Sequence, residues 1–337
     1  MDITITPLDP ADEAAFEQAY QIKRSAPFVP DMPPTPRQWF EALLRHQRHS
    51  VRFEAALASV DGVPVGLTAM EFPLLDNLDN VGVDIQVPPG HRRRGIGRAL
   101  YAYAVRRARE TGRTRIMGHS ADTMPGGVAR DPAPTAFAHA VGVKSALVEV
   151  RRRLDIDTVD QPALDVMLAG CWRRAPGYEL LTWVGPCPEE YRADLAYLDG
   201  RMVTDSPMGD LEWEPEKVDA DRIHEVDLAR KAAGTHSYHA VTRHLDSGRI
   251  VAWSNITRQA EPDWHAYQQI TIVDPDHRGH RLGTIVKIEN LRFTLRHEPA
   301  LRVIDTWNAD SNQHMIAINE ALGFRAVDIW QNWQQTI

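Results

Sequence analysis

The sequence predicts an α+β fold arranged as two copies of one domain, and three observations support this. The chain has 337 residues, more than the roughly 250–300 that one hydrophobic core usually supports. A motif recurs in the second half, because Pro89 and Arg92 follow one apolar run and Pro275 and Arg278 follow another. After each motif come a short turn of Gly and Arg residues and then a helical pattern. Strands combined with amphipathic helices in this way are typical of α+β domains.

Each copy is expected to contain two strands, a helix, a strand, a second helix and a last strand. In the first copy the opening strands flank Asp61-Gly62, a strong hairpin signal, and in the second copy they flank Asp246-Ser247-Gly248. Period-3.6 patterns after the Gly/Arg turns predict the long helices. The expected strands and long helices lie at 53–59, 65–72, 96–111, 114–119 and 146–151, and then at 238–243, 250–257, 282–297, 301–307 and 327–333.

The repeat sets the expected domain boundaries. Residues 1–156 form the N-terminal domain, 157–175 a connecting helix, and 176–337 the C-terminal domain. The acidic loop at 205–215 is assigned to the C-terminal copy because it precedes the second Gly/Arg turn. The loop at 124–134 has the composition most typical of disorder, since it is rich in Gly and Pro.

Composition excludes several classes of protein. The chain has 38 basic and 46 acidic residues, a formal charge of −8, which argues against a nucleic-acid partner. It has no apolar run of the roughly 18 residues that a membrane helix needs, and no signal peptide, so a cytoplasmic location is expected. Cys171 and Cys187 are too few for a disulfide framework or a zinc cluster, and no metal is expected. Only five of the basic residues are lysine, which indicates a GC-rich bacterial genome.

The two Gly/Arg turns have the chemistry of an anion site. Small residues let the backbone approach a ligand closely, and the free amides at a helix start attract negative charge. Arginines can add bidentate bonds to phosphate oxygens. The turns lack the Gly-Lys-Ser/Thr of a Walker loop and the third glycine of the dinucleotide fingerprint. A diphosphate site is therefore predicted, and the alternative is a tight turn with solvated arginines.

Both turns resemble the cofactor signature of the GNAT superfamily of N-acetyltransferases, Gln/Arg-x-x-Gly-x-Gly/Ala after a strand. The first turn fits it fully from Arg92 to Gly97, and the second fits except that Arg281 replaces the first glycine. The segments at 308–312 and 319–324 resemble the family's later motif. The resemblance covers nearly the whole chain and is to the tandem two-domain bacterial type, similar to mycothiol synthase-like proteins. It implies two GNAT domains of three layers, each a mixed, mostly antiparallel sheet flanked by helices.

The resemblance also implies how acetyl-CoA binds. Its pantetheine arm would lie between two parallel strands that part, and its diphosphate would lie on the Gly/Arg turn. Residues that would contact it are Val87, Arg92, Arg93, Arg94, Gly95, Ile96, Gly97 and Arg98 in the first copy, and Ile272, Val273, Arg278, Gly279, His280, Arg281, Leu282, Gly283, Thr284, Asn308, Asn312 and Met315 in the second.

Catalytic residues are expected in the C-terminal copy, which has the better later motif, although the N-terminal copy has the better turn. The resemblance assigns the thioester-polarising amide to Val273, or to Val87 if the first copy is active. Family members often protonate the leaving thiolate with a tyrosine, but Asn319 and Ala138 stand at that position here. Asn319 could position a water instead. The acceptor side is expected to involve Thr271, Gln269 and Glu212, which together with Val273 and Asn319 are the catalytic candidates.

The predicted function is acetyl-CoA-dependent N-acetylation of a primary amine on a small molecule, such as a metabolite, an antibiotic or a biosynthetic intermediate. The alternatives are acetylation of a cysteinyl amine, as by mycothiol synthase, and a catalytically silent acyl-CoA-binding protein. Acetylation of a protein is a weaker alternative. No nucleic acid or membrane is expected as a partner, and the chain is expected to be a monomer or a homodimer.

Overall fold

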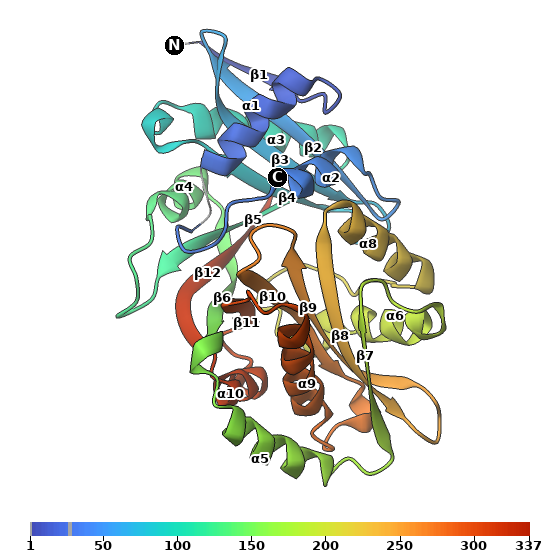
Figure 1. Ribbon diagram of the computed structural model, residues 1–337. Helices are drawn as coiled ribbons and strands as arrows, with labels where there is room; N and C mark the ends of the chain where they lie inside the picture. Colours follow the sequence, from blue (N-terminus) through green and yellow to red (C-terminus); the bar gives the residue numbers. More distant parts are fainter. Residues whose placement is uncertain (1, 26–28) are drawn as a thin grey trace. The chain divides into compact units, whose positions relative to one another are not determined.

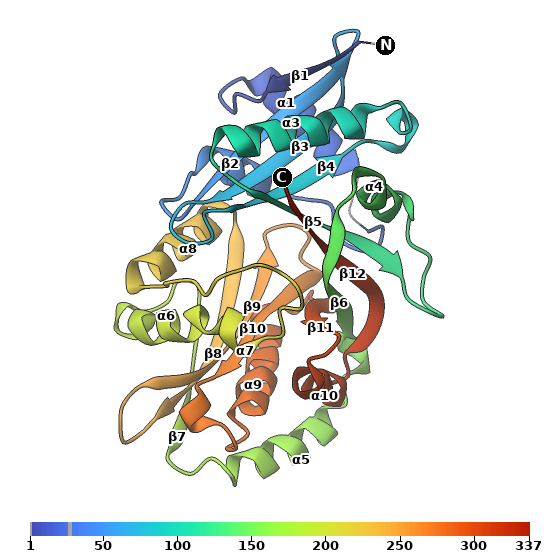
Figure 2. The same cartoon turned by 180° about the vertical axis from the view of Figure 1, so that it is seen from behind.

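The computed structural model describes residues 2–25 and 29–337, which divide into two compact units. Unit 1 comprises Met1–Glu149, Gly209–Glu214 and Asp328–Ile337, and unit 2 comprises Val150–Met208 and Pro215–Val327. Figures 1 and 2 show the elements of each unit from two sides. In the described part of the chain, no helix is both long enough and apolar enough to cross a membrane.

Unit 1 is built on a mixed sheet with the strand order β1-β2-β3-β4-β5-β12. Neighbouring strands pair antiparallel except β4 and β5, which are parallel. The strands are β1 (Ile3–Pro7), β2 (Val51–Val60), β3 (Val63–Pro73), β4 (Asn80–Gln86), β5 (Arg115–Thr123) and β12 (Arg325–Thr336). The predicted hairpin at Asp61-Gly62 joins β2 and β3.

Helices cover both faces of the unit 1 sheet. One face packs against α1 (Glu13–Ser25) and α2 (Arg37–Arg45), whose Phe16 and Phe40 meet Leu57 of β2. The other face packs against α3 (Ile96–Glu110), and α4 (Ala133–Val141) follows β5. Figure 1 shows α1 in front of this sheet, and Figure 2, from behind, shows α3 in front of it. Unit 1 thus has the three predicted layers.

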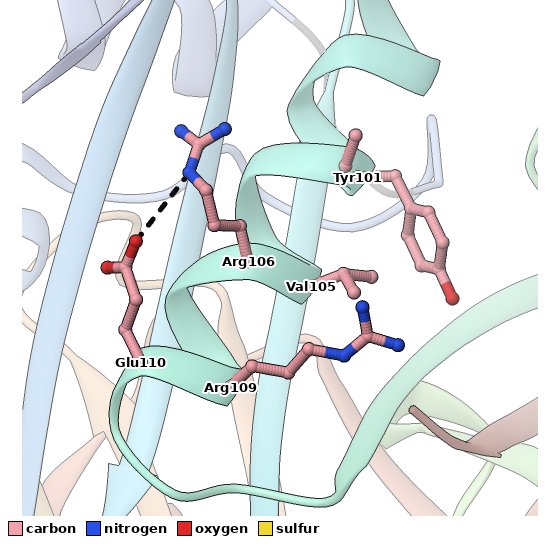
Figure 3. Close-up of a pocket in the computed structure, with 6 residues that line it drawn as sticks. Tyr101, Val105, Arg106, Arg109 and Glu110 are labelled. Atoms are coloured by element: carbon pink, nitrogen blue, oxygen red, sulfur yellow. Dashed lines mark ion pairs between the residues drawn. The ribbon is translucent and has the colours of Figure 1, made fainter.

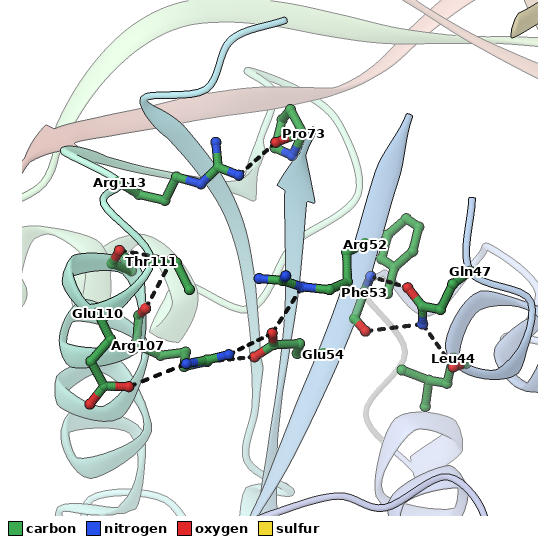
Figure 4. Close-up of polar contacts among 11 residues, drawn as sticks. Leu44, Gln47, Arg52, Phe53, Glu54, Pro73, Arg107, Glu110, Thr111 and Arg113 are labelled. Atoms are coloured by element: carbon green, nitrogen blue, oxygen red, sulfur yellow. Dashed lines mark hydrogen bonds and ion pairs between the residues drawn. The ribbon is translucent and has the colours of Figure 1, made fainter. Parts of the chain in front are cut away.

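Polar contacts fix the C-terminal half of α3 to the sheet (Figure 4). The Arg107 guanidinium donates to both carboxylate oxygens of Glu54 on β2, at 2.7 and 2.9 Å, and Arg52 Nε lies 3.0 Å from the same carboxylate. These hydrogen bonds lower the pKa of Glu54 against the opposing effect of burial. Beyond the helix, Arg113 donates to the Pro73 carbonyl at 2.7 Å. These contacts hold the C-terminal half of α3 and the segment after it against the sheet.

Unit 2 repeats this architecture with the strand order β6-β11-β10-β9-β8-β7. The strands are β6 (Lys144–Asp155), β7 (Tyr178–Val184), β8 (Thr235–His244), β9 (Ile250–Gln259), β10 (His265–Val273) and β11 (Val303–Ala309). β10 and β11 are parallel, whereas β7 to β10 pair antiparallel in sequence order.

The helices of unit 2 also lie on both faces of its sheet. α5 (Gln161–Trp172) and α9 (Leu282–His297) share one apolar core with Ala240 and Ile304. α6 (Arg192–Gly200) and α8 (Ala220–Ala232) share another with Val241 and Ile270. α7 (Met202–Asp205) follows α6, and α10 (Gln313–Leu322) follows β11. Short 3-10 helices lie at η1 (Pro89–His91), η2 (Ile156–Thr158), η3 (Glu189–Tyr191) and η4 (Pro275–His277).

The compact units are not continuous in sequence, whereas the expected domains were. Residues 328–337 belong to unit 1 because β12 pairs with β5 along its length, for example Trp333 with Gly118. The middle of the 205–215 loop, Gly209–Glu214, belongs to unit 1 as well, although its position before the second Gly/Arg turn predicts the C-terminal copy. Asn77 Nδ2 donates to the Glu214 carbonyl at 3.0 Å, and Asn80 Nδ2 to the Glu212 carbonyl at 3.1 Å.

The loop at 124–134 is held in place, despite its disorder-like composition. Arg130 is buried and forms ion pairs of 2.9 Å with Asp31 and Asp328. Its neighbour Asp131 pairs with Arg92 of the first Gly/Arg turn. The two ion pairs of the buried Arg130 anchor a segment whose Gly- and Pro-rich sequence has little structural preference of its own.

Candidate active site

In each unit the two parallel strands pair over only three residues and then part. In unit 2 the pairing joins His265–Tyr267 of β10 to Val303–Asp305 of β11, although both strands continue. Thr306 Oγ1 donates to the Gln268 carbonyl at 3.2 Å where they separate. In unit 1 the pairing of β4 with β5 likewise covers only 80–82 and 115–117. Strand edges that are not paired can take an extended ligand as an added strand.

A bulge in β10 shapes the edge next to this gap. The register of β10 with β9 shifts between Gln268 and Thr271. The buried Gln268 side chain holds the bulge, since its amide nitrogen Nε2 donates to the carbonyls of Asn255 at 2.9 Å and Ile270 at 2.8 Å. A bulge re-aims the residues that follow it, so Gln268 is a positioning residue for the end of β10.

The turn between β10 and α9 has the backbone of an anion cradle. Asp274 caps η4 by accepting from the Asp276 amide at 3.1 Å, and the backbone then takes a left-handed conformation at Gly279 (φ 86°) and Arg281 (φ 62°). α9 begins directly afterwards at Leu282. The first amides of a helix have no intrahelical acceptor, and the helix dipole favours an anion beside them.

The turn in unit 1 has the same backbone with Gly and Arg exchanged. Arg93 (φ 62°) occupies the place of Gly279, and Gly95 (φ 85°) that of Arg281. The extended residues before them match as well, since Arg92 has φ −69° and ψ 164°, and Arg278 has φ −70° and ψ 163°. Arg281 therefore keeps the left-handed conformation of the glycine it replaces, at a cost of about 1 kcal/mol. The departure from the sequence motif leaves the cradle intact.

The side chains around the second turn come from three elements of unit 2. Arg278 is half-exposed and pairs with Asp205 of α7 at 2.9 Å. Tyr178 Oη and His277 Nδ1 share a hydrogen bond of 2.8 Å, and burial lowers the pKa of His277. His280 Nδ1 lies 3.1 Å from the Arg174 carbonyl and donates to it. The turn is thus buttressed by β7 and by the segment after α5.

The first turn differs because an aromatic ring lies beside its second helical residue, Gly97. A Cβ added to Gly97 would lie 3.2 Å from the Phe137 ring of α4. A Cβ added to Gly283 would meet, within the described chain, only Val273 Cγ2 at 3.4 Å. Arg92 also donates to the Val87 carbonyl at 3.0 Å while it pairs with Asp131. The first turn of α9 is therefore more open to a ligand than the first turn of α3.

The other unit 1 residues predicted to contact the donor differ in their exposure. Ile96 is buried against the sheet, whereas Arg93, Arg94 and Arg98 are exposed. A hollow of about 530 Å³ lies further along α3, lined by Tyr101, Ala102, Val105, Arg106, Arg109 and Glu110 (Figure 3). All of its lining comes from that helix, and it includes no residue of the Gly/Arg turn or of β4. It is separate from the candidate site.

The predicted residues of α10 and β11 come together in unit 2. Asn312 caps α10 by accepting from the Met315 amide at 3.2 Å. Asn319 is fully buried, and its Nδ2 donates to Asn308 Oδ1 at 2.6 Å. Lys287 of α9, which the sequence analysis did not single out, lies against Met315 with Nζ 3.8 Å from Sδ. The sequence feature that could have identified Lys287 is the presence of a lysine within the apolar pattern of 282–297.

Three of the catalytic candidates lie together near the end of β10. Gln269 Nε2 donates to Thr257 Oγ1 at 2.8 Å, and Thr271 Oγ1 is buried with no hydrogen-bond partner among the described residues. Val273 packs against the core that includes α9, whereas the side chain of Ile272 packs on the α6 side. Any contact of Ile272 with a ligand in the gap would thus come from its backbone. Thr284, the third residue of α9, is buried.

Glu212 is not brought to these residues by any described contact. Its carboxylate lies 2.6 Å from Arg115 Nη2, and its amide donates to Gln334 Oε1 at 2.9 Å, both within unit 1. Its role beside Gln269 and Thr271 stays a prediction.

Comparisons with known proteins agree with this geometry. The sequence model of the acetyltransferase (GNAT) family matches residues 16–125. The structure is similar to a tandem GNAT protein from the clavulanic acid biosynthesis pathway, with a TM-score of 0.84 and 30% identity over 99% of this chain and 98% of that chain. The sequence is 25% identical over 297 residues to mycothiol acetyltransferase of Salinispora arenicola (strain CNS-205), covering 86% of this chain and 83% of that protein.

A more distant structure shows the same fold. Saccharomyces cerevisiae N-myristoyltransferase with bound myristoyl-CoA has a TM-score of 0.60 and 11% identity, over 100% of this chain and 79% of that chain. The α+β fold class and the tandem arrangement predicted from the sequence are confirmed by the tandem relative, which aligns along its whole length. Enzymes of this family use acyl-CoA donors. The chain therefore belongs to the GNAT family of acetyltransferases and is an acyltransferase of the tandem type.

Proposed function

We propose that this chain transfers the acetyl group of acetyl-CoA to a primary amine of a small molecule, and that unit 2 performs the reaction. The observation that carries the proposal is the open first turn of α9 beside the parted ends of β10 and β11. At the matching Gly97 of unit 1, the Phe137 ring lies 3.2 Å from an added Cβ. A diphosphate needs close approach to helix amides, and the space beside Gly283 is the less crowded of the two.

The donor would be held chiefly by backbone. The amides from Gly279 to Gly283 would bind the diphosphate, and the half-exposed Arg278 would exchange Asp205 for phosphate oxygens. The amide of Val273, at the end of β10, would polarise the thioester carbonyl. A preorganised donor of this kind is worth ~3 kcal/mol of barrier.

The acceptor would lie along β10 after the bulge. The buried Thr271 hydroxyl has no partner among the described residues, and Gln269 is exposed, so both can bond an amine or a water that carries its proton away. The amine attacks the acetyl carbon in its neutral form. The carboxylate of Glu212 pairs with Arg115 in unit 1, so the base that finally accepts this proton is not assigned to it.

Two other functions have specific support. The similarity to mycothiol acetyltransferase favours a cysteinyl amine as acceptor. Asn319 in place of the expected tyrosine favours a silent acyl-CoA-binding protein. A cytoplasmic location, a bacterial source and a monomeric or homodimeric state remain predictions.

Turnover of a panel of amines separates these functions. Purified protein is incubated with acetyl-CoA and with small amines, cysteinyl compounds or peptides, and free thiol and acetylated product are both measured. We expect acetylation of a small amine. A thermal shift with acetyl-CoA accompanied by no product from any amine would support the silent binder, and acetylation of peptides alone would contradict the proposal.

Binding of acetyl-CoA should raise the Tm. A ligand that binds only the folded state stabilises it by ~2.7 kcal/mol at a hundredfold excess over its Kd. The shift is measured by scanning fluorimetry, with adenosine as the control ligand. No shift at millimolar acetyl-CoA, together with no heat in calorimetry, would contradict donor binding.

Asn319→Ala should lower kcat about tenfold, less than the 10²–10⁴-fold typical of a direct acid or base. The Asn319 amide bonds Asn308 and orients polar groups beside α10, so its loss disorders them without removing a proton donor. Steady-state kcat and Tm are measured on the same variant. An unchanged kcat with a lowered Tm would restrict Asn319 to a structural role, and a loss above a thousandfold without unfolding would make it directly catalytic.

A further inference from the structure

The side chain of Lys287 is buried without a counter-charge. It is 2% exposed, on the face of α9 that also carries Gly283 one turn earlier. Its Nζ lies 3.8 Å from Met315 Sδ and 5.4 Å from the centre of the Phe324 ring. Within the described residues it forms no ion pair. A buried ammonium without a carboxylate partner is energetically costly.

An unsatisfied acceptor lies on the facing helix. Asn319 Oδ1 is buried and has no hydrogen-bond donor among the described residues, although its Nδ2 bonds Asn308. Met315 and Asn319 are four residues apart, so they share one face of α10. The contact between Lys287 and Met315 shows that this face meets α9. The side chains between α9 and α10 thus include the Lys287 ammonium, which has no charged partner among the described residues, and the Asn319 oxygen, which has no donor among them.

Burial alone shifts the ammonium's acidity. It lowers the pKa of Lys287 to about 7, because burial disfavours the charged form and no charged side chain of the described chain compensates. The ionisable residues of α10, His314 and Glu320, are both exposed. A proton donor works best when its pKa lies near the operating pH.

Two carboxylates on α5 and β11 have partners of their own. Asp165 of α5 pairs with Arg292 at 2.6 Å. On β11, which lies beside β10, Asp305 pairs with Arg151 and Arg153. These carboxylates are thereby committed to arginines rather than to the lysine.

We propose that Lys287 is the proton donor to the thiolate that leaves in the acetyl transfer, in the role for which Asn319 is unsuited. The inference rests on the proposed function. The amine nitrogen forms a bond to the acetyl carbon, the carbon–sulfur bond breaks, and the sulfur takes a proton from the Lys287 ammonium. The acceptor nitrogen loses one proton to water, and the neutral lysine regains one from water, so the overall reaction yields amide and free thiol. Asn319 positions the groups between the two helices.

The test compares Lys287→Met with Lys231→Met. Methionine fits an apolar site and removes only the ammonium, whereas Lys231 is exposed on α8 and controls for the loss of a positive charge. The pH dependence of kcat is measured for both variants and for the natural protein. In the natural protein kcat should fall as the pH rises through about 7, where Lys287 loses its proton. Lys287→Met should lower kcat 10²–10³-fold and remove this alkaline decline, and Lys231→Met should change neither.

The binding of acetyl-CoA to each variant, measured by calorimetry, distinguishes the possible failures. If the natural protein neither binds nor turns over acetyl-CoA, the proposed function fails. If it is active and Lys287→Met keeps both its kcat and its alkaline decline, the role of Lys287 is contradicted while the function stands. A lowered kcat with the alkaline decline preserved would also overturn the proposal, because it would mark Lys287 as structural. A second variant, Lys287→Gln, keeps the test valid if the methionine variant unfolds.

Discussion

Gly283→Glu is expected to abolish both acetyl-CoA binding and turnover while the protein stays folded. The added Cβ meets only Val273 Cγ2, at 3.4 Å, among the described residues. A glutamate in the first turn of a helix is favourable for the helix dipole. The same carboxylate would face the donor's diphosphate, and two like charges ~4 Å apart cost ~4 kcal/mol at an effective dielectric of about 20, close to a thousandfold in affinity. Calorimetry with acetyl-CoA and a turnover assay measure the loss.

Two matched variants locate the cause of that loss. Gly283→Gln has nearly the same shape without the charge and should retain much of the affinity. Gly97→Glu places the charge on the first turn of α3, where Phe137 already lies within 3.2 Å of an added Cβ, so it should lower stability and leave turnover by the folded fraction unchanged. Loss of turnover in a well-folded Gly97→Glu protein, with activity kept in Gly283→Glu, would move the active site to unit 1.

Asp305→Asn should destabilise unit 2 by about 3–5 kcal/mol, the usual effect of breaking a buried ion pair. Asp305 is fully buried and accepts from Arg151 Nη1 at 2.9 Å, from Arg153 at 2.8 and 2.7 Å, and from His265 Nε2 at 2.9 Å. The variant leaves two arginines without their carboxylate. Since His265–Tyr267 is the segment of β10 that pairs with β11, the loss should also loosen the point where the strands part.

Unfolding in urea, followed by circular dichroism, measures this effect. The control is Asp165→Asn, which removes an exposed carboxylate from its pair with Arg292 in the same unit and should cost no more than ~1 kcal/mol. Equal stability losses in the two variants would contradict the role of the buried network.

The same network predicts a dependence of stability on pH. Burial alone would raise the pKa of Asp305, but the hydrogen bonds from Arg153 and His265, with the charge of Arg151, lower it below its ordinary value. The carboxylate's stabilisation is therefore fully present above the unfolded pKa, about 3.9, and is lost as the pH falls below that value toward the folded pKa. Asp305→Asn should show a flatter decline in Tm on acidification than the natural protein.

Local sequence patterns predicted the elements that we propose hold the donor. The helix expected at 282–297 is α9, because the apolar period and the Gly/Arg turn are both local features. The hairpin at Asp61-Gly62 and the turn from Arg92 to Gly97 were recognisable for the same reason. The motif alone counts Arg281 as a mismatch. It gives no sign that an arginine there adopts the left-handed conformation of the glycine.

The features that were not predicted depend on contacts between distant residues. Nothing in the pattern of β12 shows that it pairs with β5, and nothing near Glu212 shows that Arg115 and Asn80 hold its loop in unit 1. Lys287 was overlooked because α9 is buried on most of its surface, so its apolar pattern does not single out the face that meets α10. Helix periodicity gives the element, whereas packing decides what each of its faces meets.

A crystal structure with acetyl-CoA bound would show directly which unit holds the donor. We expect the diphosphate on the amides of Gly279 to Gly283, the pantetheine arm between β10 and β11, and the sulfur between α9 and α10 within reach of Lys287 Nζ. Acetyl-CoA bound instead on the turn from Arg92 to Gly97, with Phe137 displaced and the unit 2 turn empty, would contradict this expectation.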